Sequence, residues 1–173
     1  MPRLKQVLAL EPGRVVADVG AGKGELSFAM AREVGPGGRV FSTEIDAKRL
    51  KQLRARAADA KLGNVTVVEA QSRETGLPPG CCDAIVLRRV YHHLTDPASL
   101  NASLLRSLRP GGVLAVIDFP PPFFWRRGSL GVPAKAVIGE VTARGFELVR
   151  LTDDWPGRGP LGSYCIVFRK PAA

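Results

Sequence analysis

An apolar run, Val15–Val19, interrupted only by Asp18, passes directly through glycines into a helical pattern over Glu25–Glu33. Glycines permit the sharp backbone turn that joins a strand to a helix at this distance. The helix would direct its first amide N–H groups into the space above the turn, where they favour a carboxylate or a phosphate. The sequence therefore predicts a ligand-binding strand, loop and helix near the start of the chain.

The glycine spacing separates three kinds of loop. A dinucleotide-binding loop has the pattern GxGxxG, but counted from Gly20 the third glycine position holds Glu25. A phosphate loop has the pattern GxxxxGK[ST], but Ala17 occupies its first position and Gly24 its last. The pattern that remains is GxGxG.

Strand-like and helical segments continue to alternate along the chain. The expected strands are Val15–Val19, Val40–Glu44, Val65–Val68, Ala84–Leu87 and Val113–Asp118. The expected helices among them are Glu25–Glu33, Ala47–Lys61 and Pro97–Leu108, with a short helix over Pro2–Leu10 before the first strand. This rhythm implies crossover connections, and the continuous apolar strands imply helices on both faces of a mainly parallel sheet.

The last third of the chain departs from this rhythm. A helix over Lys135–Ala143 is followed by two expected strands, Phe146–Leu151 and Ser163–Arg169, joined by a loop rich in proline and glycine. Such a connection favours antiparallel pairing. The predicted fold is α/β, with a doubly wound, mainly parallel sheet and an antiparallel hairpin at one edge.

An acidic residue ends the second strand, 20 residues beyond the glycine loop. A carboxylate at Glu44 can accept hydrogen bonds from both hydroxyls of a ribose lying over the strand ends. We expect the nearby Asp46 to cap the following helix, as we expect of Asp96 before Pro97. Asp18 faces the loop, where it either holds the loop or meets an amino group of the ligand.

Four segments resemble the class I S-adenosylmethionine-dependent methyltransferases: ADVGAGKGE, FSTEID, LPPGCCDAIVLRRVYHHL and LRPGGVLAVIDF. The resemblance covers about Leu8 to the C-terminus and is greatest to the small-molecule branch, which includes the ubiquinone/menaquinone-biosynthesis-like enzymes. It implies a seven-stranded Rossmann-like sheet whose last strand is inserted antiparallel. It also implies S-adenosylmethionine as cofactor, with its methionine part near Gly20–Gly24, its ribose on Glu44 and its adenine near the loop after the third strand. The cofactor-binding residues expected from the motifs and the resemblance are Asp18, Gly20, Ala21, Gly22, Gly24, Glu44, Ile45, Gln71, Ser72 and Arg88.

The loop after the third strand departs from the family pattern. The family often has Gly-Asp there, with the carboxylate accepting from the adenine amino group, whereas this chain has Glu69–Ser72. Gln71 can accept through its amide oxygen, but more weakly than a carboxylate. The adenine contact is therefore the weakest match to the family.

Methyl transfer is an in-line displacement, and a base is needed only if the acceptor must lose a proton. The candidates follow the fourth strand, where the ligand crevice of such a sheet lies: Arg88, Arg89, Tyr91, His92 and His93. The two histidines are the only ones in the chain, and either is a candidate general base. The alternative is that one bonds the backbone and the other packs. Arg88 or Arg89 either contacts a carboxylate of the cofactor or substrate or is a surface charge.

A segment with prolines, arginines and three consecutive aromatic side chains follows the fifth strand. We expect residues 120–134 to form a substrate-facing lid, with Phe123, Phe124 and Trp125 against the substrate. The alternatives are a satellite core patch, a contact with a partner or membrane surface, and stacking on nucleic-acid bases. The expected first strand begins early in the chain, so the site is either open or closed by this segment or by a second subunit of a homo-oligomer.

Composition limits the remaining choices. A length of 173 residues suits one domain over residues 1–173, and no apolar run reaches the ~18 residues of a membrane span. No secretory leader is recognisable, so we expect a cytoplasmic protein. The cysteines have no zinc-like spacing, and Cys81 and Cys82 are expected in the turn before the fourth strand without a role.

The formal charge of +9 permits an acidic partner such as RNA, although we expect the basic residues of Ala47–Lys61 to form a solvated helix face. The leading hypothesis is an S-adenosylmethionine-dependent methyltransferase acting on a small molecule. The alternatives are an RNA or protein methyltransferase and a catalytically silent, cofactor-binding partner subunit. No Asn-Pro-Pro-Tyr-like tetrapeptide, typical of many enzymes that methylate amino groups of nucleic acids, follows the fourth strand.

Overall fold

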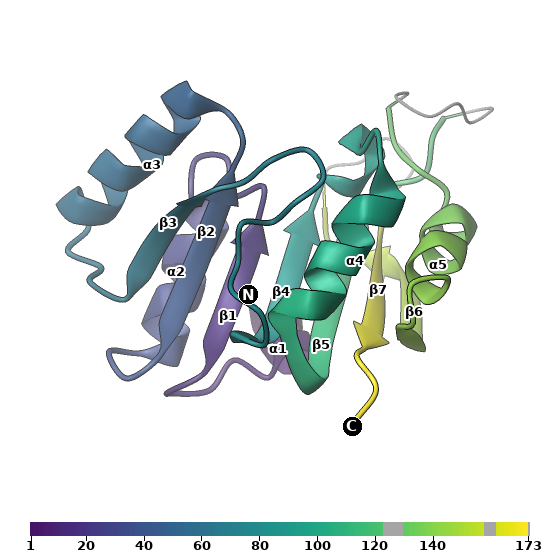
Figure 1. Cartoon of the computed structure of the whole chain (residues 1–173), viewed down its shortest axis with the longest axis horizontal. Helices are drawn as coiled ribbons and strands as arrows, with labels where there is room; N and C mark the ends of the chain where they lie inside the picture. The colour runs from purple at the N-terminus through teal and green to yellow at the C-terminus, as the bar shows by residue number, and fades with distance from the viewer. Residues whose placement is uncertain (123–129, 158–161, 173) are drawn as a thin grey trace.

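One mixed sheet of seven strands crosses the centre of the molecule in the order β3-β2-β1-β4-β5-β7-β6 (Figure 1). The computed structural model describes residues 1–122, 130–157 and 162–172. The strands are β1 Val15–Val19, β2 Arg39–Glu44, β3 Val65–Glu69, β4 Cys82–Arg88, β5 Leu108–Asp118, β6 Glu147–Trp155 and β7 Ser163–Arg169. The helices are α1 Pro2–Leu8, α2 Glu25–Val34, α3 Ala47–Asp59, the 3-10 helix η1 Tyr91–His93, α4 Pro97–Ser107 and α5 Ala134–Thr142.

The sheet is parallel from β3 through β5, and β7 is inserted antiparallel between β5 and β6. The carboxyl ends of the parallel strands therefore lie along one edge, at the top of Figure 1. The fold predicted from the sequence, a doubly wound sheet with an antiparallel edge hairpin, is confirmed.

Helices cover both faces of the sheet, which explains why its strands are apolar throughout. On β4, Ile85 and Leu87 belong to the cluster beneath α4 and α5, while Ala84 and Val86 belong to the cluster beneath α1 and α2. All four side chains are fully buried. Figure 1 shows α4 and α5 in front of the sheet and α1 and α2 behind it.

Two aspartates fix the starts of the helices that follow β2 and η1. The Asp46 carboxylate accepts from the Arg49 amide at 2.8 Å, and the Asp96 carboxylate accepts from the Ser99 amide at 3.0 Å. Each satisfies a helical N–H that has no partner within the helix. Both predicted caps are confirmed.

The predicted boundaries at the starts of β5 and β4 are wrong. β5 begins at Leu108 and not at the expected Val113, because Gly111 donates to the carbonyl of Lys170 and Lys170 donates to that of Gly112, which extends the ladder. Cys82, expected in a turn, is the first residue of β4 and is paired in register with Leu108. In both cases pairing with a distant strand decides the boundary.

The predicted substrate residues Phe123, Phe124 and Trp125 lie outside the described residues. The described ends of the segment 120–134 are tied to the sheet: Val132 donates to the carbonyl of Phe119 at 2.9 Å, and the Tyr164 hydroxyl donates to the carbonyl of Val132 at 2.8 Å. The two ends of the segment are therefore held in place beside the end of β5 and the start of β7.

No helix in the described ranges is both long and apolar enough to span a bilayer.

Gly24 is required by packing as well as by backbone conformation. Its φ is +79°, and a Cβ there would lie 2.4 Å from Leu53 Cδ1 and 2.8 Å from Phe28 Cζ. We expect Gly24→Ala to lower the free energy of unfolding by about 2–4 kcal/mol, measured by urea denaturation. Gly22→Ala, which has the strained φ of +55° but open space, should cost only about 1–2 kcal/mol.

Gly37→Ala is the matched control, because nothing lies within 4 Å of its Cβ position and its φ is not positive. Equal losses for Gly24→Ala and Gly22→Ala would contradict the packing role of Gly24.

Candidate functional site

Two cavities meet at the carboxyl ends of the strands. The main cavity, about 600 Å³, lies between the ends of β1, β2 and β3 and the segment after β4. The side cavity, about 440 Å³, lies between the glycine loop, the end of β4 and the start of β7. Gly20 and Arg89 line both. In the described part of the chain the two cavities are therefore adjacent, with Gly20 and Arg89 between them.

The Glu44 carboxylate connects the ends of β1 and β2. One oxygen accepts from the Gly22 amide at 3.1 Å, and the other accepts from the amides of Ile45 at 2.9 Å and Asp46 at 3.1 Å. Glu44 is 4% exposed yet lines the main cavity. A carboxylate has about four lone-pair sites, so three amides leave about one for a ligand.

Gly20 brings the loop against the segment after β4. Its φ is +75°, and a Cβ would lie 2.6 Å from Val90 Cγ2. The Gly20 and Ala21 amides both donate to the carbonyl of Thr43, at 3.0 and 2.9 Å. The loop is thus fixed on both sides, by β2 and by Val90.

Asp18 is buried at the end of β1, and its carboxylate accepts from the Ser27 hydroxyl at 2.7 Å. This bond ties the strand to the first turns of α2. Burial raises the pKa of Asp18 to about 6, against the lowering effects of the Ser27 hydrogen bond and the nearby Arg88 charge. Asp18 also lines the side cavity, so its charge faces any ligand there.

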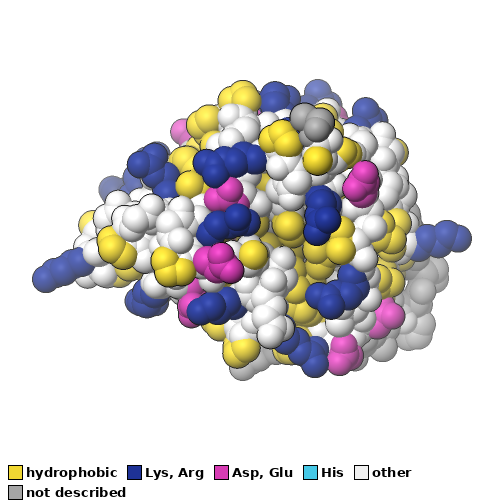
Figure 2. All heavy atoms as spheres, turned by 90° about the horizontal axis from the view of Figure 1, so that it is seen from below, with side chains coloured by type: hydrophobic (Ala, Val, Ile, Leu, Met, Phe, Trp, Pro, Cys, Tyr) yellow, Lys and Arg dark blue, Asp and Glu magenta, His cyan; other side chains and the backbone are white. Residues whose placement is uncertain are grey.

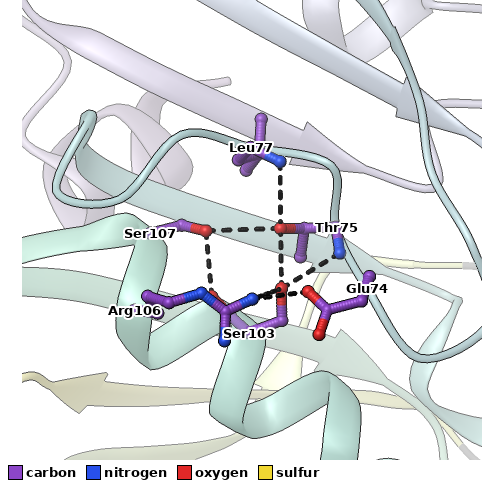
Figure 3. A network of polar contacts seen from close by, with 6 residues as sticks. All are labelled: Glu74, Thr75, Leu77, Ser103, Arg106 and Ser107. Atoms are coloured by element: carbon purple, nitrogen blue, oxygen red, sulfur yellow. Dashed lines mark hydrogen bonds and ion pairs between the residues drawn. The ribbon is translucent and has the colours of Figure 1, made fainter.

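The loop after β3 is anchored to α4 by a hydroxyl network (Figure 3). The Thr75 hydroxyl lies 3.0 Å from that of Ser103 and 3.3 Å from that of Ser107, and the Thr75 amide donates to Ser103. Arg106 pairs with Glu74 on the outside of the same network. Thr75 lines the main cavity together with Gln71 and Ser72, so the network holds this wall in place.

His92 is held in a single orientation by Asp118, the last residue of β5. The ring Nδ1 lies 2.8 Å from Asp118 Oδ1, and the His92 amide donates to Oδ2 at 3.2 Å. Asp118 Oδ1 also accepts from the Phe119 amide at 3.0 Å. An ionised Asp118 accepts from an Nδ1–H, which leaves Nε2 of a neutral His92 as the basic nitrogen. Burial raises the pKa of Asp118, although the His92 charge acts in the opposite direction.

His93 is the histidine that lines the main cavity. Its ring centroid lies 3.9 Å from that of His92. Partial burial, with a smaller contribution from the His92 charge, lowers the pKa of His93 below its ordinary value. The lowered pKa favours the neutral imidazole of His93, which is able to accept a proton.

Arg89 has a backbone conformation that side chains other than glycine rarely adopt, with φ of +61°. Its amide donates to the carbonyl of Ile117 at 2.7 Å, and its guanidinium lies over the Phe119 ring, 5.5 Å from the centroid. Such strain costs about 1–3 kcal/mol and is concentrated at functional sites. The result is a cation at the junction of the two cavities.

The structure brings most of the predicted site residues to one edge of the sheet. Those in the main cavity are Gly20, Glu44, Ile45, Gln71, Ser72 and His93. Those in the side cavity are Asp18, Gly20, Ala21 and Arg88. Gly22, Gly24 and His92 line neither cavity. The Gly22 amide binds Glu44, Gly24 leaves room for Leu53, and His92 binds Asp118. Tyr91 is fully buried and bonds Asn101 and Glu140 instead of facing the crevice.

Sequence reasoning missed Asp118 and Thr75. A usable indication for Asp118 was the single acid that ends the apolar run of β5, in the same position as Glu44 at the end of β2. Thr75 has no such indication, because its partners Ser103 and Ser107 lie on a helix far along the chain.

Comparisons with known proteins relate this chain to a described family. A family model described as a methyltransferase domain matches residues 17–116, more than half of the chain. The ubiquinone/menaquinone biosynthesis C-methyltransferase of Vibrio vulnificus is 34% identical over 114 residues, which cover 65% of this chain and 44% of that enzyme. The chain thus matches less than half the length of this curated relative.

Solved structures share the fold. The structure of an S-adenosylmethionine-dependent methyltransferase from Aquifex aeolicus superposes with a TM-score of 0.82 and 21% identity, covering 98% of this chain and 88% of that one. Phosphoethanolamine N-methyltransferase 2 of Haemonchus contortus, solved in complex with S-adenosyl-L-methionine, gives a TM-score of 0.81 and 15% identity, covering 97% and 51%.

The raised pKa of Asp18 predicts a pH dependence of stability. Protonation of Asp18 is favoured in the folded state, so its buried charge destabilises the protein above pH 6 and that cost disappears as the pH falls from about 6 to 4. The stability of the wild type relative to Asp18→Asn should rise by about 3 kcal/mol between pH 7 and pH 4, measured by urea denaturation. Ser27→Ala, which removes the bond that lowers this pKa, should shift the transition to higher pH. A difference that is constant with pH would show that Asp18 titrates normally.

Proposed function

The chain belongs to the class I S-adenosylmethionine-dependent methyltransferases, and on that premise we propose that it binds S-adenosylmethionine and methylates a small-molecule acceptor. The observation that carries the proposal is Glu44, a buried carboxylate that is fixed by three amides and still faces the main cavity. A nucleoside bound over the strand ends would meet this group first.

The main cavity suits the adenosine part of the cofactor. Glu44 can accept one ribose hydroxyl without losing a bond, and a second if the Gly22 amide releases it. Ile45, the next residue, is 63% exposed and offers an apolar surface to a flat ring. Gln71 and Ser72 form part of the wall that the Thr75 network anchors, and either can bond the edge of the adenine.

The side cavity suits the methionine part. Asp18 supplies a carboxylate for the amino group, and Arg88 supplies a guanidinium for the carboxylate. The sulfur would lie where the two cavities meet, beside Gly20, because both cavities open onto that residue. When bound there, the cofactor supplies an electrophilic methyl group.

Two side chains are suited to hold the acceptor, His93 in the main cavity and Arg89 where the two cavities adjoin. His93 faces the main cavity as a neutral base. Asp118 fixes the backbone and the ring of His92, against which the His93 ring packs. Arg89 presents a positive charge that can stabilise an acceptor oxygen as it loses its proton. The acceptor class is therefore a small molecule with an acidic hydroxyl or a carboxylate near the methylated atom.

The named relative methylates carbon in ubiquinone/menaquinone biosynthesis, which favours a small-molecule acceptor over RNA or protein for this chain. Three unpaired cysteines are consistent with a reducing compartment, so we place the activity in the cytoplasm, with residues 1–173 acting as one domain. The basic side chains Lys48, Lys51 and Arg54 on α3 are exposed, as in a solvated helix face, whereas Arg49 lines the main cavity.

Glu44→Gln should weaken binding of S-adenosylhomocysteine by about 1.5–3 kcal/mol, because the neutral amide accepts a weaker hydrogen bond and also loses the charge that holds Gly22. Titration calorimetry measures the dissociation constant. Glu69→Gln is the matched control: Glu69 is paired with Glu44 in register across β2 and β3, but it is exposed and lines neither cavity. Equal affinity in the wild type and Glu44→Gln would place the ribose elsewhere, and no binding to the wild type would overturn the proposal.

His93→Ala should lower kcat by about 10²–10⁴-fold for acceptors that must lose a proton, while changing the S-adenosylhomocysteine affinity by less than about threefold. Methyl transfer from labelled S-adenosylmethionine to a panel of phenols, quinols and hydroxybenzoates measures this. Tyr91→Phe, at a buried position outside both cavities, is the comparison variant. Full activity in His93→Ala would exclude it as the base, and tight cofactor binding without turnover on any acceptor would favour the silent partner subunit.

A further inference from the structure

Two neighbouring cysteines bring their sulfur atoms together at the opposite edge of the sheet. The Sγ atoms of Cys81 and Cys82 are 3.1 Å apart. Neighbouring side chains in a regular strand point to opposite faces. Here Cys81 lies in the turn before β4, and the register between β4 and β5 is irregular between Cys82 and Ala84. The alternation is therefore interrupted, and both side chains pack against the same apolar cluster.

One sulfur of the pair, that of Cys81, lies beside a cavity. Cys82 is fully buried, whereas Cys81 is partly exposed and lines a cavity of about 500 Å³ together with Pro78, Arg39 and Arg109. Figure 2 shows this edge of the molecule from below, where Lys and Arg side chains outnumber the acidic ones around apolar patches. A small reagent would meet Cys81 first and Cys82 behind it.

The hydrogen bond between the two sulfur atoms, more than the charges around them, favours a thiolate on Cys81. Arg109 donates to Asp83 at 2.6 Å, and Arg14 lies 3.8 Å from the same carboxylate. Either sulfur can donate the hydrogen bond that joins them. This bond lowers the pKa of Cys81, with a smaller contribution from Arg109, although burial opposes the lowering. The same bond, together with burial, raises the pKa of Cys82. The pair thus combines a nucleophilic sulfur with a neighbouring thiol that keeps its proton.

The geometry disfavours zinc and a disulfide. Two sulfur ligands on a tetrahedral zinc with bonds of about 2.3 Å are about 3.8 Å apart, farther than this pair. The described residues contain no group of three or more His, Cys, Asp or Glu side chains placed to hold a metal. The Cα atoms of adjacent residues are about 3.8 Å apart, below the range of about 4.4–6.8 Å in which disulfides form without strain. The pair suits an atom that binds both sulfur atoms with a narrow S–X–S angle and carries one further substituent that does not come from the protein.

We propose that Cys81 and Cys82 form a dithiol site that binds monosubstituted trivalent arsenicals. With an arsenoxide, two As–S bonds form and the bonds from arsenic to oxygen break. The two thiol protons leave with that oxygen as one water, and arsenic stays trivalent, so no oxidant or reductant is required. The site is independent of the cofactor cavities, which lie at the other edge of the sheet.

Intact-mass spectrometry of the reduced chain with phenylarsine oxide tests the proposal. The wild type should gain one phenylarsenic unit per chain, and 2,3-dimercaptopropanol should remove it while a monothiol does not. Loss of one thiol should weaken binding by about a hundredfold or more, because the second As–S bond forms intramolecularly. Cys81→Ser and Cys82→Ala should therefore not hold the adduct against a monothiol. No uptake by the wild type, or equally tight uptake by Cys81→Ser, would overturn the proposal.

Cys165→Ser is the matched control, because Cys165 is a buried single thiol on β7, and this variant should bind as the wild type does. If Cys82→Ala fails to fold, as judged by circular dichroism, a second measurement in the wild type replaces it. Iodoacetamide should alkylate Cys81 before the other cysteines, as located by peptide mapping, and the alkylated chain should no longer take up the arsenical. Uptake that survives alkylation of Cys81 would refute the site.

Discussion

The hydrogen bonds that Glu44 accepts hold together the edge of the sheet on which any ligand must rest. Its two oxygens bind the Gly22 amide of one connection and the Ile45 and Asp46 amides of the next. Without them, the amides of Gly22, Ile45 and Asp46 would each lose this hydrogen-bond acceptor. The same carboxylate therefore holds the backbone amides in place and also faces the cavity. A ligand would compete with these amides for the few lone pairs of its two oxygens.

A comparable arrangement appears at the end of β5, which is separated from β2 by β1 and β4 in the sheet. Asp118 ends β5 as Glu44 ends β2, and it too is surrounded by amides, those of His92 and Phe119. Each acid fixes the chain immediately after a strand and orients the residues that line the cavities. Buried carboxylates satisfied in this way keep their positions whether or not a ligand is present.

The sequence was sufficient for the fold because each local preference agreed with the global arrangement. The apolar runs, the caps at Asp46 and Asp96 and the turn glycines all indicated the same sheet. The wall of the main cavity formed by Gly20, Glu44, Ile45, Gln71 and Ser72 was expected in part from the rule that ligands lie at the carboxyl ends of parallel strands and in part from the resemblance to the family. What could not be predicted depends on distant pairing: the extension of β5 past Gly111, the hydroxyls of Ser103 and Ser107 on the Thr75 loop, and the convergence of Cys81 and Cys82. The roles of Gly22 and Gly24 could not be separated either, since spacing alone does not show that one binds Glu44 and the other leaves room for Leu53.

The insertion of β7 between β5 and β6 has a consequence for the order in which the molecule can assemble. β5 needs β7 to satisfy one side of its backbone, yet β6 is synthesised first. During translation β5 therefore emerges with an open, apolar edge, and the adjacent β6 cannot close it in the native order. The side cavity is also incomplete until β7 is in place, because Ser163 forms part of its wall. Before β7 has been synthesised, the first half of the chain can fold, but the free edge of β5 is then open to pairing with other chains.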